Sequence, residues 1–358
     1  MAVTRLTVAE FLRLGRSVPV LDVRSPGEFA HARIPGAISM PLFNDEERAA
    51  VGTAYKQVSR QEAIKIGLDY FGPKMRTMVE QAEQLGRESG PGHQSVAIHC
   101  WRGGMRSGAV AWLLDLYGFE VYLLEGGYKA FRNWVLRQFE EDFNFHLVGG
   151  YTGSGKTEVL YRLRDQGEAV LDLEGLANHK GSAFGGLDRA PQPSSEQFEN
   201  MIATELFRLT EDDRNRVIWA EDESQRIGLV NMPMKLWERF REKPLFFIDV
   251  PFEQRLEYIT QDYGKNSKEV LINAIIRIQK RLGGLETKTS VNCLLEDDVR
   301  GCFSILLKYY DKHYMKALNN RPNLPSVMIP LQVAGTDPVA NMQTILKAKH
   351  ERTADLHR

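Results

Sequence analysis

The sequence contains few cysteines. Only three of its 358 residues are cysteine, at positions 100, 293 and 302. An odd number with no C-x-x-C pair argues against a disulfide framework and lacks the usual spacing of a structural zinc site. We therefore expect a protein of a reducing compartment.

Long apolar runs and an excess of charge of either sign are also missing. No apolar run reaches the ~18 residues of a membrane-spanning helix, and the N-terminal stretch MAVTRLTVAEFLRLGRS alternates charged with apolar residues. The 46 Lys and Arg residues nearly cancel the 47 Asp and Glu residues, so no overall field points to nucleic acid. These absences predict a cytoplasmic protein without a membrane partner, in which any RNA binding depends on a local patch.

Strand-like and helix-like segments alternate along the chain, without repeats or low-complexity tracts. The strand-like segments lie at 18–23, 95–100, 145–148, 168–175, 216–224 and 244–251, and 120–131 is a strand followed by a turn. Such alternation predicts an α/β fold in which helices cover parallel sheets. We expect two domains, 1–140 and 144–358, with a helical connector at 129–143 and a mostly helical tail from about residue 265.

A cysteine in the segment HCWRGGMRSG follows the buried strand SVAI. At the carboxyl end of a parallel strand, backbone N–H groups and a helix N-terminus converge and lower a thiol pKa. Arg102 and Arg106 add positive charge, and Gly103 and Gly104 let the amides turn inward. The loop therefore predicts an anion cradle and a nucleophile at Cys100, although a free cysteine in this position is also compatible with a small buried core residue.

The segment GYTGSGKT at 150–157 matches G-x-x-x-x-G-K-[ST] between the strand FHLV and the helix TEVLYRLRD. Loop amides would wrap a diphosphate, the lysine would reach its outer oxygens and the threonine would hold Mg²⁺ if a metal is used. The alternative is a chance match in a glycine-rich turn. The residues predicted to bind the diphosphate are Gly150, Gly153, Ser154, Gly155, Lys156 and Thr157.

Three consecutive carboxylates, Glu221, Asp222 and Glu223, end the strand-like segment RVIWAEDES. Glu221 and Asp222 are the candidates for binding a metal or a water molecule, and at least one of the three acids is expected to face solvent. The metal ligands stay unknown, with Thr157 and Asp222 as candidates for Mg²⁺. No adenine-binding motif is present, so the sequence does not identify the diphosphate as a nucleotide.

Three further stretches are candidates for contacts with a polymeric substrate. The loop LANHKGSAFGG at 176–186 carries His179, Lys180 and Ser182, and either contacts the acceptor or is a polar surface loop. The basic stretches at 128–137 and 275–284 either bind RNA phosphates or form solvated helix faces.

The segments LDVRSPGEFAHARIPGAISMPL, HCWRGGMRS and LLEGGYKAFR resemble the three signature segments of a rhodanese domain, over roughly residues 5–140. The resemblance implies that Cys100 carries a persulfide or its selenium analogue, and that Asp22 is a buried structural acid with Arg24 beside it. Residues 101–105 separate the cysteine from the Arg-Ser pair, one residue more than ordinary sulfurtransferase loops tend to have. This longer spacing is that of cysteine phosphatases and suits a tetrahedral phosphate-like anion.

The ordered motifs at 22–41, 99–108, 150–157, 176–186 and 221–228, followed by YYDKHY, resemble the tRNA 2-selenouridine synthase family along nearly the whole chain. The resemblance implies an enzyme that acts in two steps on 2-thiouridine at the wobble position of tRNAs of the Lys, Glu and Gln types. Geranyl diphosphate first S-geranylates the base, and selenium from selenophosphate then replaces the S-geranyl group. It also implies contact with the selenophosphate-producing enzyme, and no tightly bound cofactor is predicted.

Other functions are compatible with the same motifs. A P-loop kinase with a regulatory or phosphatase-like rhodanese domain would turn over ATP with Mg²⁺. A phosphatase-like module would use Cys100 to hydrolyse phosphate esters. An RNA-binding adaptor would need neither Cys100 nor Lys156.

Overall fold

The computed structural model describes residues 3–88, 94–181, 185 and 190–356, which form two compact units. The first unit comprises Met1–Gln138 and Glu196–Thr204, and the second comprises Phe139–Ser195 and Glu205–Arg358. The division after Gln138 falls inside the predicted connector. The segment Glu196–Thr204, which the sequence analysis assigns to the second domain, instead completes the first unit.

The first unit contains a five-stranded sheet in the order β1-β5-β4-β2-β3, in which all neighbours are parallel. Its central strands are nearly continuous apolar runs because helices bury both faces of a parallel sheet. The parallel α/β architecture predicted for this unit is therefore confirmed. The strands are β1 (Thr4–Leu6), β2 (Val20–Asp22), β3 (Ile38–Ser39), β4 (Ser95–His99) and β5 (Glu120–Leu124).

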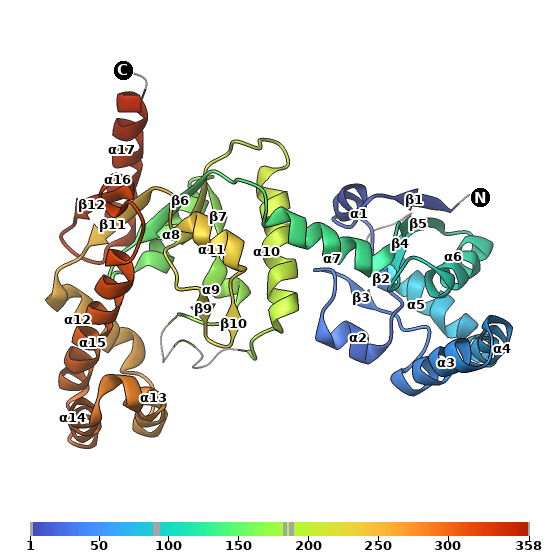
Figure 1. Ribbon diagram of the computed structural model, residues 1–358, viewed down its shortest axis with the longest axis horizontal. Helices are drawn as coiled ribbons and strands as arrows, with labels where there is room; N and C mark the ends of the chain where they lie inside the picture. Colours follow the sequence, from blue (N-terminus) through green and yellow to red (C-terminus); the bar gives the residue numbers. More distant parts are fainter. Residues whose placement is uncertain (1–2, 89–93, 182–184, 186–189, 357–358) are drawn as a thin grey trace. The chain divides into compact units, whose positions relative to one another are not determined.

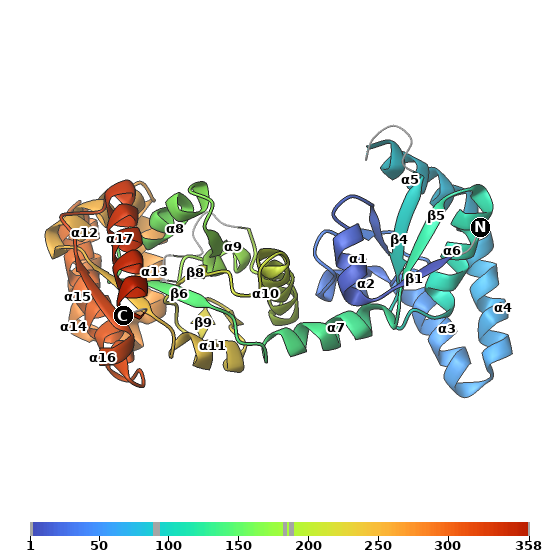
Figure 2. The same cartoon turned by 90° about the horizontal axis from the view of Figure 1, so that it is seen from above.

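Helices cover both faces of this sheet. Figure 2 shows α1 on one side of the strands and α5 and α6 on the other. Apolar side chains of α5 and α6 join those of β2, β4 and β5 in one core. The helices are α1 (Val8–Leu14), α2 (Pro26–His31), α3 (Asp45–Gln57), α4 (Arg60–Phe71), a short 3₁₀ turn (Gly72–Lys74), α5 (Met75–Glu88), α6 (Met105–Tyr117) and α7 (Gly127–Gln138).

The first half of α10 (Ser195–Thr210) packs on α7 through a buried polar network. Tyr128 and Asn200 are fully buried, and the Tyr128 hydroxyl donates to Glu196 Oε1 at 2.6 Å. Asn200 Nδ2 donates to the same hydroxyl oxygen at 2.8 Å, and Arg132 Nη1 donates to Asn200 Oδ1 at 3.1 Å. These bonds satisfy polar groups that would be costly to bury alone, which explains why Glu196–Thr204 belongs to the first unit.

The second unit contains another five-stranded parallel sheet, in the order β12-β11-β6-β8-β7, and a separate antiparallel pair of β9 and β10. The tail predicted as mostly helical includes the edge strand β12, which the sequence analysis missed. Its half-exposed pattern and Pro330 suit only a sheet edge. The strands are β6 (Phe145–Gly149), β7 (Ala169–Leu171), β8 (Ile218–Glu221), β9 (Arg226–Ile227), β10 (Val230–Asn231), β11 (Leu245–Asp249) and β12 (Met328–Gln332).

Two groups of helices in this unit enclose separate cores. Helices α8 and α17 contribute to the core of the sheet, whereas α12 to α15 enclose a second core of their own and form the orange and red group in Figure 1. Within the described part of the chain, no helix combines the length and apolar character needed to cross a membrane. The helices are α8 (Lys156–Asp165), α9 (Leu173–Leu176), α11 (Met234–Phe240), α12 (Phe252–Tyr263), α13 (Lys268–Leu282), α14 (Gly284–Leu295), α15 (Val299–Asn319), α16 (Leu324–Val327) and α17 (Pro338–Leu356).

Candidate functional site

Cys100 lies directly after β4, at the carboxyl edge of the first sheet, and is only 3% exposed. Loop 101–104 leads into α6, and Cys100 Sγ lies 3.2 Å from Ser107 Oγ. The start of α7 closes the loop, because the Tyr128 N–H donates to the Cys100 carbonyl oxygen at 2.8 Å. A Cβ at Gly127 would come within 2.4 Å of that oxygen, so only glycine permits this close approach.

Hydrogen-bond donors around the sulfur favour the thiolate of Cys100. Burial raises the pKa of this thiol, but the Ser107 hydroxyl and N–H, followed by the N–H groups of Arg102 and Gly104, outweigh burial and hold the pKa below its ordinary value. The donors predicted from the glycine-rich loop are therefore present. They increase the fraction of the sulfur present as thiolate, which is the nucleophilic form of cysteine.

Ser107→Ala is expected to raise the pKa of Cys100, by about one pH unit for the loss of one hydrogen bond to a charged group. Thiolate absorbance in the ultraviolet, followed against pH, measures this midpoint. Cys302 does not interfere, because burial raises its pKa to about 12. Cys100→Ser should abolish the rise in absorbance at the lowest pH, which comes from the Cys100 thiolate. An unchanged midpoint in Ser107→Ala would contradict this assignment of the donors.

The two arginines predicted beside Cys100 differ in placement. Arg106 forms an ion pair with Glu28 of α2, with 2.6 Å between Arg106 Nη1 and Glu28 Oε2. Arg102 is exposed to solvent. Burial opposes the charged form of Arg106, but Glu28 and then the Cys100 thiolate raise its pKa. A pocket of about 480 Å³ lies beside this loop and includes Glu28 and Trp101 in its lining.

Asp22 and Arg24 form a buried ion pair beneath the loop. The two are fully or almost fully buried, and Arg24 Nη2 lies 2.6 Å from Asp22 Oδ2. The Arg24 guanidinium stacks on Tyr128, 3.9 Å from the ring centre. Burial lowers the pKa of the adjacent His99 to about 4, so this imidazole is neutral. The buried position of Asp22 implied by the rhodanese resemblance is confirmed, and the pair supports the loop from below.

The 150–157 segment forms a phosphate-binding loop between β6 and α8, in the strand–loop–helix context that the motif requires. Gly153 and Gly155 have φ values of 82° and 72°, in the left-handed region that favours glycine. Lys156 Nζ donates to the Gly150 carbonyl at 3.2 Å and so folds back over the loop. The amides and the ammonium group together surround a space suited to an anion.

Three glutamates lie together at one end of this loop, and two of them contact Thr157. The Thr157 hydroxyl lies 2.7 Å from Glu221 Oε1 and 3.2 Å from Glu174 Oε2. Ligand atoms of Glu174, Glu221 and Glu223 all lie within 4.8 Å of one another. Burial and then mutual repulsion raise the pKa to about 9 for Glu174 and to about 8 for Glu223. An all-oxygen group of this kind suits a hard divalent cation such as Mg²⁺.

Asp222 lies outside this group of carboxylates. Its Oδ1 lies 2.6 Å from Arg321 Nη2, and its Oδ2 accepts from the Tyr314 hydroxyl at 2.9 Å. The Tyr314 oxygen also accepts from the Gly150 N–H at 3.3 Å. Asp222, predicted from the sequence to bind a metal or a water molecule, instead connects the phosphate-binding loop to α15. Glu174 was not predicted as a site residue, and Glu223 was not among the two carboxylates chosen as candidates.

A cavity of about 690 Å³ opens from the phosphate-binding loop. The loop and the glutamates line one part of it, and residues of α11, α12, α13 and α15 line much of the rest. Much of this second part is aromatic, which gives the cavity a face suited to an unsaturated chain or a nucleobase. The aromatic lining residues are Trp237, Tyr258, Tyr263, Tyr309, Tyr310 and Tyr314.

The loop predicted to contact the acceptor reaches the same cavity in part. Lys180 and Gly181 line the cavity, and Lys180 Nζ lies 3.0 Å from Asp262 Oδ2. His179 precedes them, whereas Ser182 lies outside the described residues. The contact with an acceptor stays a prediction.

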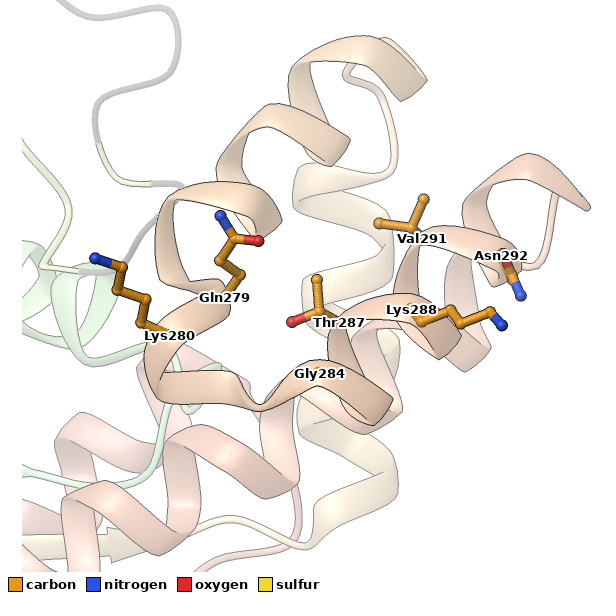
Figure 3. A pocket seen from close by; sticks show the side chains of 7 residues that line it. All are labelled: Gln279, Lys280, Gly284, Thr287, Lys288, Val291 and Asn292. Carbon is orange, nitrogen blue, oxygen red and sulfur yellow. The ribbon is translucent and has the colours of Figure 1, made fainter.

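The basic stretches 128–137 and 275–284 differ in which of their side chains are exposed and which are bonded to other residues. In 128–137, Tyr128 is buried and Arg132 is bonded to α10, whereas Lys129 and Arg137 are exposed. The stretch 275–284 ends at a pocket of about 610 Å³ between α13 and α14. Figure 3 shows Lys280 and Lys288 pointing to opposite sides of this turn. Their ammonium groups do not converge on a single anion.

Comparison with known proteins agrees with both halves of this description. The model of the rhodanese-like domain matches residues 7–133, and that of the tRNA 2-selenouridine synthase AAA domain matches residues 143–328. A tRNA 2-selenouridine synthase of Sulfurovum sp. strain NBC37-1 is 38% identical over 292 residues, which cover 76% of this chain and 78% of the relative. The synthase of Bdellovibrio bacteriovorus is 33% identical over 350 residues, covering 86% and 90%. That of Hydrogenovibrio crunogenus is 37% identical over 288 residues, covering 75% and 77%. The chain therefore belongs to the tRNA 2-selenouridine synthase family.

Proposed function

We propose that this protein is a tRNA-modifying enzyme that replaces the sulfur of 2-thiouridine at the wobble position with selenium. Its substrates would be tRNAs of the Lys, Glu and Gln types in the cytoplasm, and selenophosphate would come from the enzyme that makes it. One observation carries the proposal: a cysteine of lowered pKa and a phosphate-binding loop that opens into an aromatic cavity occur in one chain. Membership of the family supports the same reaction.

In the first step, the sulfur of 2-thiouridine attacks the first carbon of geranyl diphosphate. A carbon–sulfur bond forms, the carbon–oxygen bond breaks, and diphosphate leaves with the electron pair. Lys156 would exchange its bond to the Gly150 carbonyl for the outer oxygens of the leaving group, and the loop amides would bind the remaining oxygens. This step uses the phosphate-binding loop without hydrolysis of ATP.

The carboxylates beside the loop fit a divalent cation. Thr157, Glu174, Glu221 and Glu223 would hold Mg²⁺ through oxygen atoms alone. When bound, Mg²⁺ would neutralise negative charge on the diphosphate. The raised pKa values of the glutamates agree with this role, because a cation would relieve the repulsion that raises them.

Mg²⁺ is expected to stabilise the protein more in alkaline than in acidic solution. Without a cation, the folded state binds more protons than the unfolded state, because the pKa values of Glu174 and Glu223 are raised to about 9 and about 8. The free energy of unfolding therefore falls as the pH rises from about 4.5 towards 9. Mg²⁺ at about 100 times its Kd should restore ~2.7 kcal/mol at alkaline pH, and less at acidic pH where protons compete.

Thermal unfolding with and without Mg²⁺, at about pH 8.5 and about pH 6, measures this effect. Glu223→Gln removes one carboxylate and should reduce the shift in Tm caused by Mg²⁺, while raising the Tm of the cation-free protein at alkaline pH. A Tm that Mg²⁺ leaves unchanged at both pH values would contradict the cation site.

The aromatic face of the cavity would hold the geranyl chain. Tyr258 and Tyr263 of α12 and Tyr309 and Tyr310 of α15 line the same cavity as the phosphate-binding loop, so a chain attached to a diphosphate can reach them. Burial of an unsaturated chain against aromatic rings is favourable, with about 25 cal/mol for each Å² of apolar surface removed from water.

In the second step, selenium replaces the S-geranyl group. The selenium of selenophosphate attacks the base and forms a carbon–selenium bond, the carbon–sulfur bond breaks, and the geranyl thiolate leaves with the electron pair. Water then attacks phosphorus, the phosphorus–selenium bond breaks, and phosphate is released. Alkylation in the first step makes this sulfur a leaving group. Cys100 would position selenophosphate, whose tetrahedral anion suits a loop with donors at Ser107, Arg102 and Gly104.

Mass spectrometry of tRNA nucleosides tests the proposed function. Purified protein and 2-thiouridine tRNA are incubated with geranyl diphosphate and then with selenophosphate, in the absence of ATP. The S-geranyl nucleoside should appear first and 2-selenouridine second. No change without ATP, but turnover with it, would instead favour a P-loop kinase with a regulatory rhodanese domain.

A further inference from the structure

Two arginines stand together in the lining of the cavity of the second unit. Arg241 directly follows α11, and Arg321 lies shortly after α15. Arg321 is only 6% exposed, and its Nη2 is bonded to Asp222. Among the described residues, 3–88, 94–181, 185 and 190–356, none forms a hydrogen bond with its buried Nη1. A buried guanidinium N–H without an acceptor is costly, so it indicates a ligand.

The second arginine adds positive charge at the same place. Burial and then the charge of Arg321 lower the pKa of Arg241, as expected where two guanidinium groups line one cavity. Asp222 is the carboxylate that acts on both, and it also accepts from Tyr314. Two cations around one shared carboxylate leave an excess of positive charge that an anion would balance.

A flat aromatic surface lies beside these charges. The Arg241 guanidinium lies 4.9 Å from the centre of the Trp237 ring, and Trp237 itself lines the cavity. Aromatic rings beside cationic groups are typical of sites that bind unpaired nucleotides, where the ring stacks on a base and the cation contacts the backbone.

We propose that Arg241 and Arg321 bind a backbone phosphate of the tRNA next to the modified base, with Trp237 stacking on a neighbouring base. This inference rests on the proposed function, because it assigns how the tRNA enters the cavity. The phosphate-binding loop already offers Lys156 and its amides to a diphosphate, so the arginine pair is a second anion site in the same cavity. Its occupant carries both a phosphate and a base.

Arg241→Gln tests the site, with Lys235→Gln as the matched control. Lys235 lies on α11, which Arg241 directly follows, is mostly exposed and is paired with Glu140, so its substitution removes the same charge from the same region of the chain without touching the cavity lining. Binding of fluorescent 2-thiouridine tRNA is measured by anisotropy at several salt concentrations. Arg241→Gln should weaken binding about tenfold and reduce the slope of log K against log salt by about one, while the control should match the wild type.

Steady-state kinetics of geranylation show whether the arginine pair binds tRNA or a small anion. The KM for tRNA should rise in Arg241→Gln and the KM for geranyl diphosphate should stay unchanged. Arg321→Lys, which keeps the charge but loses the fork of donors, should show a smaller loss of tRNA affinity. A raised KM for geranyl diphosphate with unchanged tRNA affinity and salt slope would overturn the proposal.

The wild-type protein distinguishes a failure of this inference from a failure of the proposed function. If the wild type converts 2-thiouridine tRNA but Arg241→Gln binds tRNA as tightly as the wild type and with the same salt slope, only the arginine site is overturned. A wild type that binds no tRNA would overturn both.

Discussion

Lys156→Ala is expected to abolish both the geranylated and the selenated product, with the rate of geranylation falling by about 100-fold or more. The ammonium group is the cation placed over the phosphate-binding loop, 3.2 Å from the Gly150 carbonyl, where diphosphate would gain charge as it leaves. Selenation should also disappear, because its substrate is the product of the first step. Initial rates of both nucleosides, measured by mass spectrometry, give the result.

Lys235→Ala is the control for this experiment. It removes an exposed lysine of the same unit that is paired with Glu140. Both activities should then match the wild type, as should the affinity of Lys156→Ala for tRNA. Geranylation by Lys156→Ala at the wild-type rate would show that the loop does not bind the leaving group.

Cys100→Ala should stop selenation and let S-geranylated tRNA accumulate. Loss of the group that positions the selenium donor reduces the rate by on the order of 10²-fold or more. Geranylation should keep its rate, because the phosphate-binding loop and the aromatic cavity belong to the second unit and contain no residue of the cysteine loop. Amounts of the S-geranyl and selenium nucleosides over time measure the two steps in one reaction.

Cys293→Ala provides the matched control, since Cys293 is a half-buried thiol of α14 whose pKa is raised by burial and by nearby acids. It should support both steps. Loss of both products in Cys100→Ala, while the variant stays folded, would refute the division of labour between the two units. Selenation at the wild-type rate would remove Cys100 from the reaction.

The local parts of the fold could be predicted because neighbouring residues determine them. The buried run before Cys100 forms β4 as predicted, and Gly118, with a φ of 110°, ends α6 in the left-handed conformation that glycine favours. Partners distant in sequence were missed. The strand β12 depends on pairing with β11, and the place of Glu196–Thr204 in the first unit depends on the hydroxyl of Tyr128.

In the candidate sites too, features within one short segment could be predicted, whereas contacts between distant segments could not. The phosphate-binding loop and the donors around Cys100 are encoded within short segments, so their geometry could be predicted. The glutamate group could not, because Glu174 comes from α9 and meets Glu221 only in the folded sheet. Asp222 and Glu221 are adjacent at the end of β8, where successive side chains point to opposite sides, so Asp222 meets Tyr314 instead of Thr157.

The most direct test of the account supplies tRNA that already carries S-geranyl-2-thiouridine, together with selenophosphate, to each variant. If the two steps are separate, Lys156→Ala should convert this substrate to 2-selenouridine at the wild-type rate, and Cys100→Ala should leave it unchanged. Failure of Lys156→Ala on the pre-geranylated tRNA, in a variant that still binds tRNA, would contradict the assignment of geranylation to the phosphate-binding loop and of selenation to Cys100.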